Sequence, residues 1–344
     1  MRRTASIFLG ACLVLLAIPS SVALAADGDA AGAGDRLPVS VPVRTIDTPD
    51  RSGQNGIVRI RVGSSDLSVM LDTGSVGLRL WNGKPAGAVK TSVTAPAAVG
   101  GAPLPGQYAK AAIAIGGVRT AVAVPFQLID TDSSYIKQWK SKGIAGILGI
   151  GVGRGALPNP LALLPGSLGT RWSVHFARDR SSSSSSDADR SGALVLGAVA
   201  PGSAIMNFQL SPQGKSSAGV LLWDDHSAAG CWTFGFGSRA EQCVPTWFDS
   251  GFTVMRIKGK SFSSLPQTAS HLLLPGTSVS LAAGSSAFVA HRFVAGHVGS
   301  RNLARVLDSG RSVINTGNSF YFDYTVSYDV ALGKLALSNS VKGN

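Results

Sequence analysis

The sequence predicts an all-β protein, and three observations support this prediction. Apolar residues occur in short runs, either alternating or continuous, while helical periodicity is scarce. The 344 residues include 42 glycines and 17 prolines, a usage typical of many turns. Among them stand the β-branched and aromatic residues that strands favour. The length allows one large domain or two lobes of about 100–200 residues each.

Eight segments are expected to form strands. Gly56–Val62 alternates strictly and predicts a half-exposed strand, whereas the apolar, glycine-rich Ile144–Gly151 is expected to be buried. Ala111–Ile115 and Val118–Leu128 flank two glycines and predict a hairpin. The full set is Gly56–Val62, Leu67–Leu71, Val76–Trp81, Ala111–Ile115, Val118–Leu128, Ile144–Gly151, Trp172–Phe176 and Ala193–Leu196.

Three other segments carry weaker signals. Residues 181–186 are all serine, and because strands are expected close on both sides, we interpret them as the loop of an elaborated hairpin rather than a domain linker. Ser285–Val294 and Arg301–Leu307 show modest helical periodicity and are the expected helices.

The N-terminus predicts export. Arg2 and Arg3 precede an apolar run, Ile7–Ile18, and Ala23–Ala25 supplies an A-x-A site, so we expect a signal peptide over residues 1–25. The apolar run is too short to span a bilayer, so no stable membrane insertion is expected. A lipoprotein site at Cys12 is the alternative, but the longer apolar run follows this cysteine instead of preceding it. We expect a secreted chain, extracellular or periplasmic.

Charge suggests an anionic partner without indicating nucleic acid. The formal net charge is +12, from 31 Lys and Arg against 19 Asp and Glu, and falls to +10 once the two arginines of the signal are removed. The basic residues are scattered singly, without the clustered footprint of a nucleic-acid site. We therefore expect a basic surface and no nucleic-acid partner.

Motifs for cofactors and metals fail. Gly151–Ala156 fits the dinucleotide pattern G-x-G-x-x-A, but Leu157–Pro160 follows and would break the helix that such a loop must open. Gly214–Ser216 resembles the end of a phosphate-binding loop, yet the required earlier glycine is Gln209. No cofactor and no metal are expected, because the five histidines show no ligand spacing: His175, His226, His271, His291 and His297.

Two cysteines remain after export. Cys231 and Cys243 form an even pair in an oxidising compartment, and no further ligands lie nearby at metal-binding spacing. We expect one disulfide.

Two similar turns carry the candidate chemistry. Val69–Ser75 places Asp72 on a tight turn after an apolar strand, and Phe248–Thr253 repeats the arrangement around Asp249, 177 residues later. A single turn of this kind is common in secreted β-proteins, but two copies half a chain apart favour a paired site. Two carboxylates brought face to face cannot both ionise, so one acts as base while the other stays protonated.

The residues around the two carboxylates have expected roles. The hydroxyls of Thr73 and Ser250 can tie the two turns together by hydrogen bonds. Gly74 and Gly251 allow tight turns and close approach of another segment. Ser75 and Thr253 complete the expected supporting set.

From about residue 55 to 340 the sequence resembles the pepsin-like aspartic peptidases, in which the shared proton is an established property. The matching motifs are Leu71–Ser75, Gly146–Gly151, Trp172–Phe176 with Gly192–Gly197, and Phe248–Gly251. Phe320–Asp329 and Gly333–Leu337 resemble the family's final strands, so the resemblance implies strands there. A short export signal, one disulfide and no N-x-[ST] acceptor suit a bacterial member. The Cys231–Cys243 loop ends six residues before Asp249, where many relatives keep a disulfide.

The resemblance implies a two-lobed β fold with a cleft between the lobes and one aspartate from each. We expect a loose leader over residues 26–50, an N-terminal lobe over 51–180 and a C-terminal lobe over 181–344. The implied activity is hydrolysis of an extended polypeptide by a water activated between Asp72 and Asp249, in a monomer without cofactors.

Three departures from the family pattern bear on activity. Members usually carry Ser or Thr three residues after each aspartate, but Phe252 stands there in the second turn, with Thr253 one position late. We therefore expect the outer oxygen of Asp249 to be less well bonded, which would raise the pKa of the pair. The flap hairpin lacks its usual tyrosine; Tyr108 is the nearest candidate, although it can also be a packing residue on the returning strand. A glycine expected near residues 313–314 is shifted to Gly317.

Two functions follow from these features. The first is a secreted aspartic endopeptidase. The second is a catalytically weak or inactive relative that uses the cleft or its rim to bind proteins or wall polymers. Both aspartates favour the first function, while Phe252 and the atypical flap favour the second.

Overall fold

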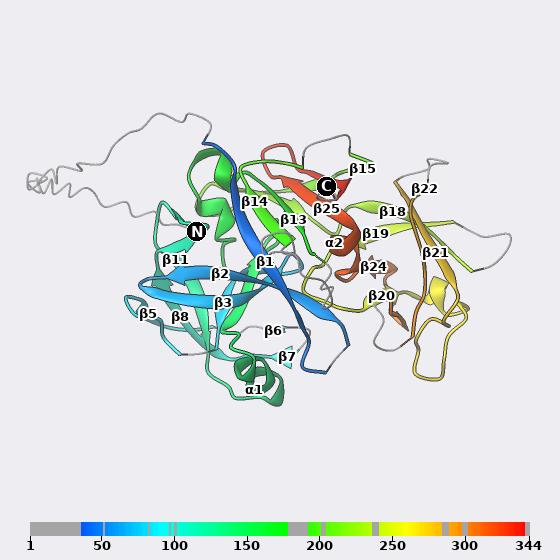
Figure 1. Cartoon of the computed structure of the whole chain (residues 1–344), viewed down its shortest axis with the longest axis horizontal. Coiled ribbons are helices and arrows are strands. Elements are labelled where there is room, and N and C mark those ends of the chain that lie inside the picture. The colour runs from blue at the N-terminus through cyan, green and yellow to red at the C-terminus, as the bar shows by residue number, and fades with distance from the viewer. Residues whose placement is uncertain are drawn as a thin grey trace, which may run out of the picture. The chain divides into compact units, whose positions relative to one another are not determined.

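Strands dominate the computed structural model of the chain, as predicted (Figure 1). It describes residues 36–50, 52–81, 83–95, 98–99, 102–177, 192–200, 204–235, 241–283, 289–297 and 302–340. These belong to a unit that spans residues 35–344. The predicted signal peptide and the serine run lie outside the described residues.

Three groups of elements build the described part of the chain. The first strands are β1 (Val39–Asp47), β2 (Gln54–Val62), β3 (Ser65–Asp72), β4 (Val76–Leu80), β5 (Val89–Ala95), β6 (Ala98–Val99), β7 (Ala102–Pro103), β8 (Gly106–Ala111), β9 (Ile113–Ile115), β10 (Val118–Arg119), β11 (Val124–Ile129), β12 (Gly146–Ile150), β13 (Arg171–His175) and β14 (Gly192–Leu196). The later strands are β15 (Met206–Gln209), β16 (Ser211–Lys215), β17 (Leu221–Asp224), β18 (Ala229–Phe234), β19 (Gln242–Trp247), β20 (Met255–Lys258), β21 (Ser278–Ala283), β22 (Val289–Val294), β23 (Ala304–Leu307), β24 (Val313–Asn315), β25 (Tyr324–Asp329) and β26 (Lys334–Asn339). The helices are α1 (Ser134–Ser141) and α2 (Ser319–Asp323), with short 3₁₀ turns at Leu161–Leu163, Gly166–Gly169 and Lys260–Phe262.

Two large sheets hold the candidate aspartates. Asp72 ends β3, in a 15-stranded sheet with the order β15-β26-β25-β13-β14-β1-β2-β3-β12-β4-β11-β8-β5, to which β9 and β10 add at the side. Asp249 follows β19, in a seven-stranded sheet with the order β22-β21-β18-β19-β24-β20-β23. Strands β15, β25 and β26 come from beyond residue 200 yet join the first sheet, so a sheet crosses the predicted lobe boundary at residue 180. The boundary itself stays a prediction.

Most predicted strands are confirmed. The segment Ile144–Gly151 contains β12, whose five residues are all buried between β3 and β4. β9 and β10 form the predicted hairpin around Gly116 and Gly117, whose φ angles of 59° and 79° are open to glycine without strain. That hairpin stops at Arg119, however, and the remainder of the predicted second strand becomes β11, paired with β8 and β4.

Four segments differ in conformation from what was expected. The expected helices at Ser285–Val294 and Arg301–Leu307 are wrong, because β22 and β23 occupy their described parts and pair with β21 and β20. Conversely, the expected strand Phe320–Asp329 begins as α2. The leader expected to be loose over residues 26–50 contains β1, which runs alongside β14 and β2 (Figure 1). Pairing with partners far along the chain decided these conformations.

Helix α1 was missed because it is short and only weakly apolar. The Oγ of Ser133 caps it by accepting a hydrogen bond from the amide of Ile136 at 3.3 Å. Ile136 and Trp139, three residues apart on one face, are buried in a small cluster with Trp81 and Met70. This packing holds the start of α1, including Tyr135, beside β3, the strand that ends at Asp72.

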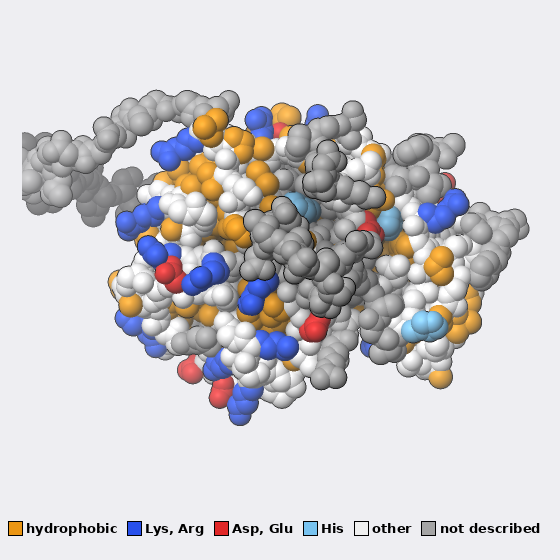
Figure 2. Space-filling model, in the orientation of Figure 1, with side chains coloured by type: hydrophobic (Ala, Val, Ile, Leu, Met, Phe, Trp, Pro, Cys, Tyr) orange, Lys and Arg blue, Asp and Glu red, His pale blue; other side chains and the backbone are white. Residues whose placement is uncertain are grey.

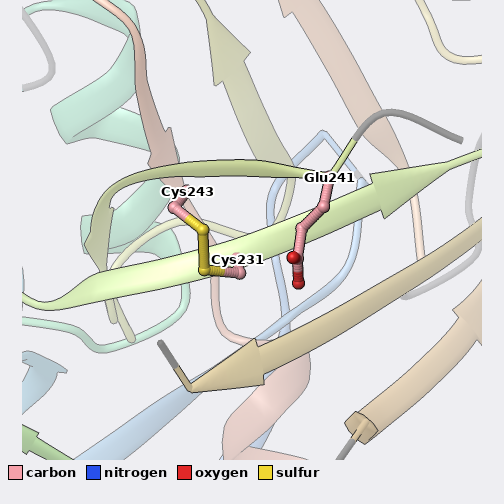
Figure 3. A group of neighbouring side chains, drawn as sticks. All are labelled: Cys231, Glu241 and Cys243. Carbon is pink, nitrogen blue, oxygen red and sulfur yellow. A yellow bond between two sulfur atoms is a disulfide. The ribbon is translucent and has the colours of Figure 1, made fainter. Parts of the chain in front are cut away.

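The predicted disulfide is confirmed. Cys231 on β18 and Cys243 on β19 lie directly opposite each other and are bonded (Figure 3). Glu241 lies close enough to suggest a metal site, but the sulfurs are bonded to each other and so cannot act as thiolate ligands. The pair therefore links two neighbouring strands ahead of Asp249.

Basic side chains do not form a single block on the face drawn in Figure 2, where lysines and arginines are spread across the surface. Within the described residues, no helix combines the length and the apolar character needed to cross a membrane.

Candidate active site

Asp72 ends the buried strand β3, on a turn that holds its carboxylate. β3 runs parallel to β12, with Asp72 opposite Gly149. The amide of Gly74 donates to Asp72 Oδ1 at 2.8 Å, and the hydroxyl of Ser75 donates to Oδ2 at 2.6 Å. The side chain is only 8% exposed. Both oxygens are thus fixed by donors from the turn itself, including the predicted Ser75.

Asp249 lies on the corresponding turn after β19 and is 1% exposed. The amide of Gly251 donates to its Oδ1 at 2.9 Å. Its outer oxygen, Oδ2, accepts a hydrogen bond at 2.6 Å from Nδ2 of Asn315. Asn315 ends β24, which runs parallel to β19 with Asn315 opposite Trp247.

Asn315 corrects the expectation that the outer oxygen of Asp249 would be poorly bonded. Its own Oδ1 accepts from the amide of Gly317 at 2.9 Å, so the amide group is oriented with Nδ2 toward Asp249. Gly317 has a φ of 61°, which suits glycine and bends the chain back after β24. The hydroxyl missing at Phe252 is therefore replaced by an amide from a strand 66 residues later.

Thr253 makes its hydrogen bond elsewhere. Its Oγ1 lies 2.9 Å from Oγ of Ser52, so it ties the second turn to the segment before β2 and not to the carboxyl group of Asp249. Phe252 lies with its ring 3.9 Å from the guanidinium carbon of Arg256. One position of offset thus changes the role of the hydroxyl completely.

Thr73 and Ser250 tie the two turns together, as predicted. The amide of Thr73 donates to Oγ of Ser250, and the amide of Ser250 donates to Oγ1 of Thr73, both at 2.9 Å. Each hydroxyl in turn donates across to a carbonyl before the opposite aspartate, that of Phe248 at 2.8 Å and that of Leu71 at 3.0 Å. This reciprocal set joins segments 177 residues apart and fixes the two carboxyl groups against each other.

Gly74 and Gly251 are the points of closest approach. A Cβ added to Gly74 would clash with the carboxyl group of Asp249, and one added to Gly251 would lie 2.5 Å from Oδ1 of Asp72. Each glycine therefore lies against the aspartate of the other turn, which is the close approach expected of these residues.

The two carboxyl groups hydrogen-bond to each other and behave as one acid pair. Burial, followed by the negative charge of Asp72, raises the pKa of Asp249 to about 8. Burial also raises the pKa of Asp72, but Ser75, Gly74, the charge of Arg79 and the bond from Asp249 all favour its ionised form. Asp72 therefore loses its proton first, and Asp249 keeps the shared one.

Arg79 was not anticipated from the sequence. It lies on β4, half-buried, and its guanidinium donates to the carbonyls of Val76 and Gly77 at 3.2 and 3.3 Å. Burial lowers the pKa of Arg79, while the charge of Asp72 raises it. A cation held in this way under the first turn favours ionised Asp72.

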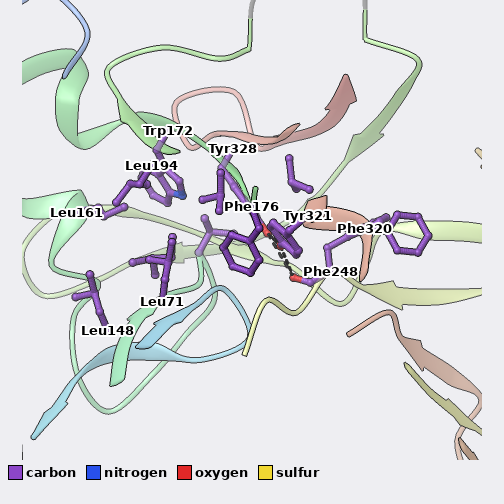
Figure 4. Packing of buried hydrophobic residues seen from close by; sticks show 14 of the residues in the cluster. Leu71, Leu148, Leu161, Trp172, Phe176, Leu194, Phe248, Phe320, Tyr321 and Tyr328 are labelled. Carbon is purple, nitrogen blue, oxygen red and sulfur yellow. Dashed lines mark hydrogen bonds between the residues drawn. The ribbon is translucent and has the colours of Figure 1, made fainter. Parts of the chain in front are cut away.

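Buried aromatic residues contact the two turns, and Figure 4 shows Tyr321 and Tyr328 close to Phe248. The hydroxyl of Tyr321, on α2, lies 2.7 Å from Oγ1 of Thr73, donates to the carbonyl of Phe248 at 3.0 Å and lies 3.1 Å from the hydroxyl of Tyr328. Both tyrosines are almost completely buried. Their segment was expected to be strand only, and no short-range signal marks a helical turn that aims Tyr321 at the site.

A cleft of about 1110 Å³ contains both aspartates. Its walls come from both sheets and from α1, and include Thr48, Asp50, Ser52, Met70, Leu104, Ser133, Tyr135, Trp139, Trp247, Phe252, Val254, Arg256, Lys258, Leu272, Leu303 and Arg305. Such a volume exceeds that of a typical small-molecule pocket.

Tyr108 does not line this cleft. It lies on β8, the returning strand of the hairpin that β5 begins, and its carbonyl accepts from the hydroxyl of Thr91 at 3.1 Å. The tyrosine at the cleft is Tyr135, which packs edge-on against Trp81 and Trp139 at centroid distances of 6.4 and 6.2 Å. The position of Tyr108 matches a packing residue, whereas Tyr135 was missed because α1 was missed.

The two rejected motifs lie beside one cavity of about 460 Å³, whose lining includes Gly153, Arg154, Lys215 and Ser216. Within the described residues 151–160, no helix follows β12, as the two prolines predict, so a pyrophosphate would meet no helix N-terminus. Lys215 ends the strand β16.

These features define the fold of the pepsin-like aspartic proteinases. The chain is similar in structure to an aspartic proteinase from the fungus Irpex lacteus, with a TM-score of 0.59 and 19% sequence identity over 90% of this chain and 100% of that one. No protein-family model matches the sequence, and no curated protein matches it. At 19% identity the structural similarity shows the fold alone. The bacterial source stays a prediction.

Proposed function

We propose that this chain is an aspartic endopeptidase. The observation that carries the proposal is the pair Asp72 and Asp249, which share a hydrogen bond inside a cleft large enough for several residues of an extended polypeptide. The turns that hold them are tied reciprocally by Thr73 and Ser250, so the pair is rigid before substrate binds. Both carboxyl groups come from one chain, which supports a monomer as the active unit.

In the proposed mechanism, ionised Asp72 accepts a proton from a water molecule while the water oxygen attacks the scissile carbonyl carbon. Asp249 donates its proton to the carbonyl oxygen, which gives a neutral tetrahedral intermediate. The proton on Asp72 then passes to the leaving nitrogen as the C–N bond breaks, and Asp249 recovers a proton from the intermediate. No step needs a cofactor or a covalent bond to the enzyme.

The disulfide supports the predicted export. The disulfide between Cys231 and Cys243 is typical of proteins in an oxidising compartment. We propose that the protein acts outside the cytoplasm after removal of residues 1–25. Sequencing of the mature protein's N-terminus tests this part, with a start at Ala26 as the expected result.

Cleavage of a mixed peptide pool between pH 3 and pH 9 tests the activity. The wild type should cleave internal bonds, whereas Asp72→Asn and Asp249→Asn should each be slower by at least a thousandfold, because each removes one half of the acid–base pair. A wild type that cleaves no faster than the two variants at any pH contradicts the proposal and favours an inactive binding protein.

A further inference from the structure

Three cations line one wall of the cleft. Arg256 and Lys258 lie two residues apart on β20, so their side chains point to the same face. Arg305 on β23 lies directly opposite Arg256 in the parallel pairing. On its other side Arg256 lies opposite Asn315, the residue that binds Asp249. Asn315, Arg256 and Arg305 therefore form a row across three neighbouring strands that begins at the acid pair. We call the three cations, Arg256, Lys258 and Arg305, the basic wall.

The basic wall is not neutralised from within. Among the described residues, none of its three side chains makes an ion pair or a hydrogen bond to a carboxylate. Besides the acid pair, the only carboxylate among the described lining residues is Asp50. Burial lowers the pKa of Arg256, the charge of Asp249 raises it, and the neighbouring charge of Arg305 lowers it. An anion placed between the two arginines would relieve this repulsion.

Arg256 is also oriented for recognition. Its guanidinium carbon lies 3.9 Å from the centroid of the Phe252 ring, so the ring supports one face of the planar group. Stacking leaves the N–H edge of a guanidinium available, and that edge matches a carboxylate with two parallel hydrogen bonds. The phenylalanine that replaces the family's hydroxyl therefore has a use of its own, since Asn315 has taken over the bond to Asp249.

We infer that the basic wall is a subsite for an acidic side chain, Asp or Glu, of the polypeptide substrate, on the Asp249 side of the scissile bond. This inference rests on the proposed peptidase function. The net charge of +10 expected after removal of residues 1–25 fits it, because a basic protein gathers acidic polypeptides at its surface.

Matched peptides test the inference. In a cleavable peptide, each position on either side of the scissile bond is changed in turn to Glu or Gln, and kcat/KM is measured at low salt. For the wild type, Glu should exceed Gln by about tenfold to a hundredfold at one position, the range of a charge-assisted hydrogen bond. Arg256→Gln and Arg305→Gln should each reduce that ratio severalfold, and high salt should also reduce it. Arg292→Gln, an exposed change on β22 outside the cleft, should leave the ratio as in the wild type.

Failure of the inference can be told apart from failure of the peptidase proposal. Binding of the Glu and Gln peptides to the Asp72→Asn variant is measured by calorimetry, which needs no turnover. Tighter binding of the Glu peptide, lost in Asp72→Asn combined with Arg305→Gln, supports the subsite even if the wild type proves inactive. Equal binding of the two peptides, or a Glu preference that survives both arginine substitutions, overturns the inference even if the wild type cleaves peptides well.

Discussion

Replacing Asn315 with leucine removes the donor to the outer oxygen of Asp249 while keeping a side chain of similar size. The bond lost is 2.6 Å long and buried, and it favours the ionised form of Asp249. A hydrogen bond to a charged group contributes about 1.5–3 kcal/mol. Since one pKa unit corresponds to about 1.4 kcal/mol, the pKa of Asp249 should rise by about 1–2 units above its value of about 8.

The direction of the effect on activity follows from the roles of the two aspartates. Catalysis needs Asp72 ionised and Asp249 protonated, so the alkaline fall of kcat/KM reports the loss of the Asp249 proton. Asn315→Leu should move this alkaline limb up by about 1–2 pH units. Ser75→Ala removes the matching donor from Asp72, so it should move the acid limb up instead and leave the alkaline limb in place.

The assay is kcat/KM for one peptide from pH 3 to pH 10, with circular dichroism at each pH to show that the variants stay folded. Asp225 is a second carboxyl group that could titrate in this range, because burial and the charge of Asp224 raise its pKa to about 7. It lies near Gly151. Repeating the pH profile with Asp225→Asn shows whether Asp225 contributes to either limb. Adding Phe252→Ser to Asn315→Leu should return the alkaline limb toward its original position, because it restores the hydroxyl three residues after Asp249. An alkaline limb that stays in place, or that moves to lower pH, in Asn315→Leu refutes the assigned role.

Three other predictions concern the site and its support. Gly74→Ala should lower kcat by at least a hundredfold, because its Cβ would displace the carboxyl group of Asp249, whereas Gly310→Ala, in open space, should have no effect on the same assay. Stability to urea should fall as pH rises from about 4 to 8, because folded Asp249 holds its proton while the unfolded carboxyl group ionises. Asp249→Asn should show a shallower fall in the same measurement. Replacing Cys231 and Cys243 with alanine should reduce the free energy of unfolding by about 3 kcal/mol, the closure entropy of a loop with a separation of 12 residues, and an unchanged urea midpoint would contradict this.

Local pattern alone predicted a mostly β protein and most of its early strands. Strict alternation in Gly56–Val62 indicates a strand with one buried face. The continuous apolar run Ile144–Gly151 indicates a strand buried on both faces. The same pattern misread residues 289–294 and 304–307 as helix, because their strand conformation comes from pairing with distant partners.

The candidate site was predictable to the extent that its residues repeat. Asp72 and Asp249, with the hydroxyl and glycine that follow each, form a pattern visible twice in the chain, and the reciprocal bonds of Thr73 and Ser250 follow from that symmetry. The two turns differ at Phe252, where the second turn lacks the hydroxyl group that Ser75 supplies in the first. From this difference the sequence predicted a poorly bonded carboxylate at Asp249, whereas Asn315 supplies the missing hydrogen bond.

The sequence by itself determined that two aspartates lie on matching turns, that the fold is built from strands and that two cysteines pair. Only the tertiary structure decided which groups complete the site, because Asn315, Tyr321, Tyr135 and the basic wall reach it from strands and helices tens to hundreds of residues away. A hydrogen bond depends on the distance between two atoms in space, and sheet register sets that distance. Asn315 reaches Asp249 because β24 lies beside β19 in parallel, a pairing that no local feature of either segment encodes.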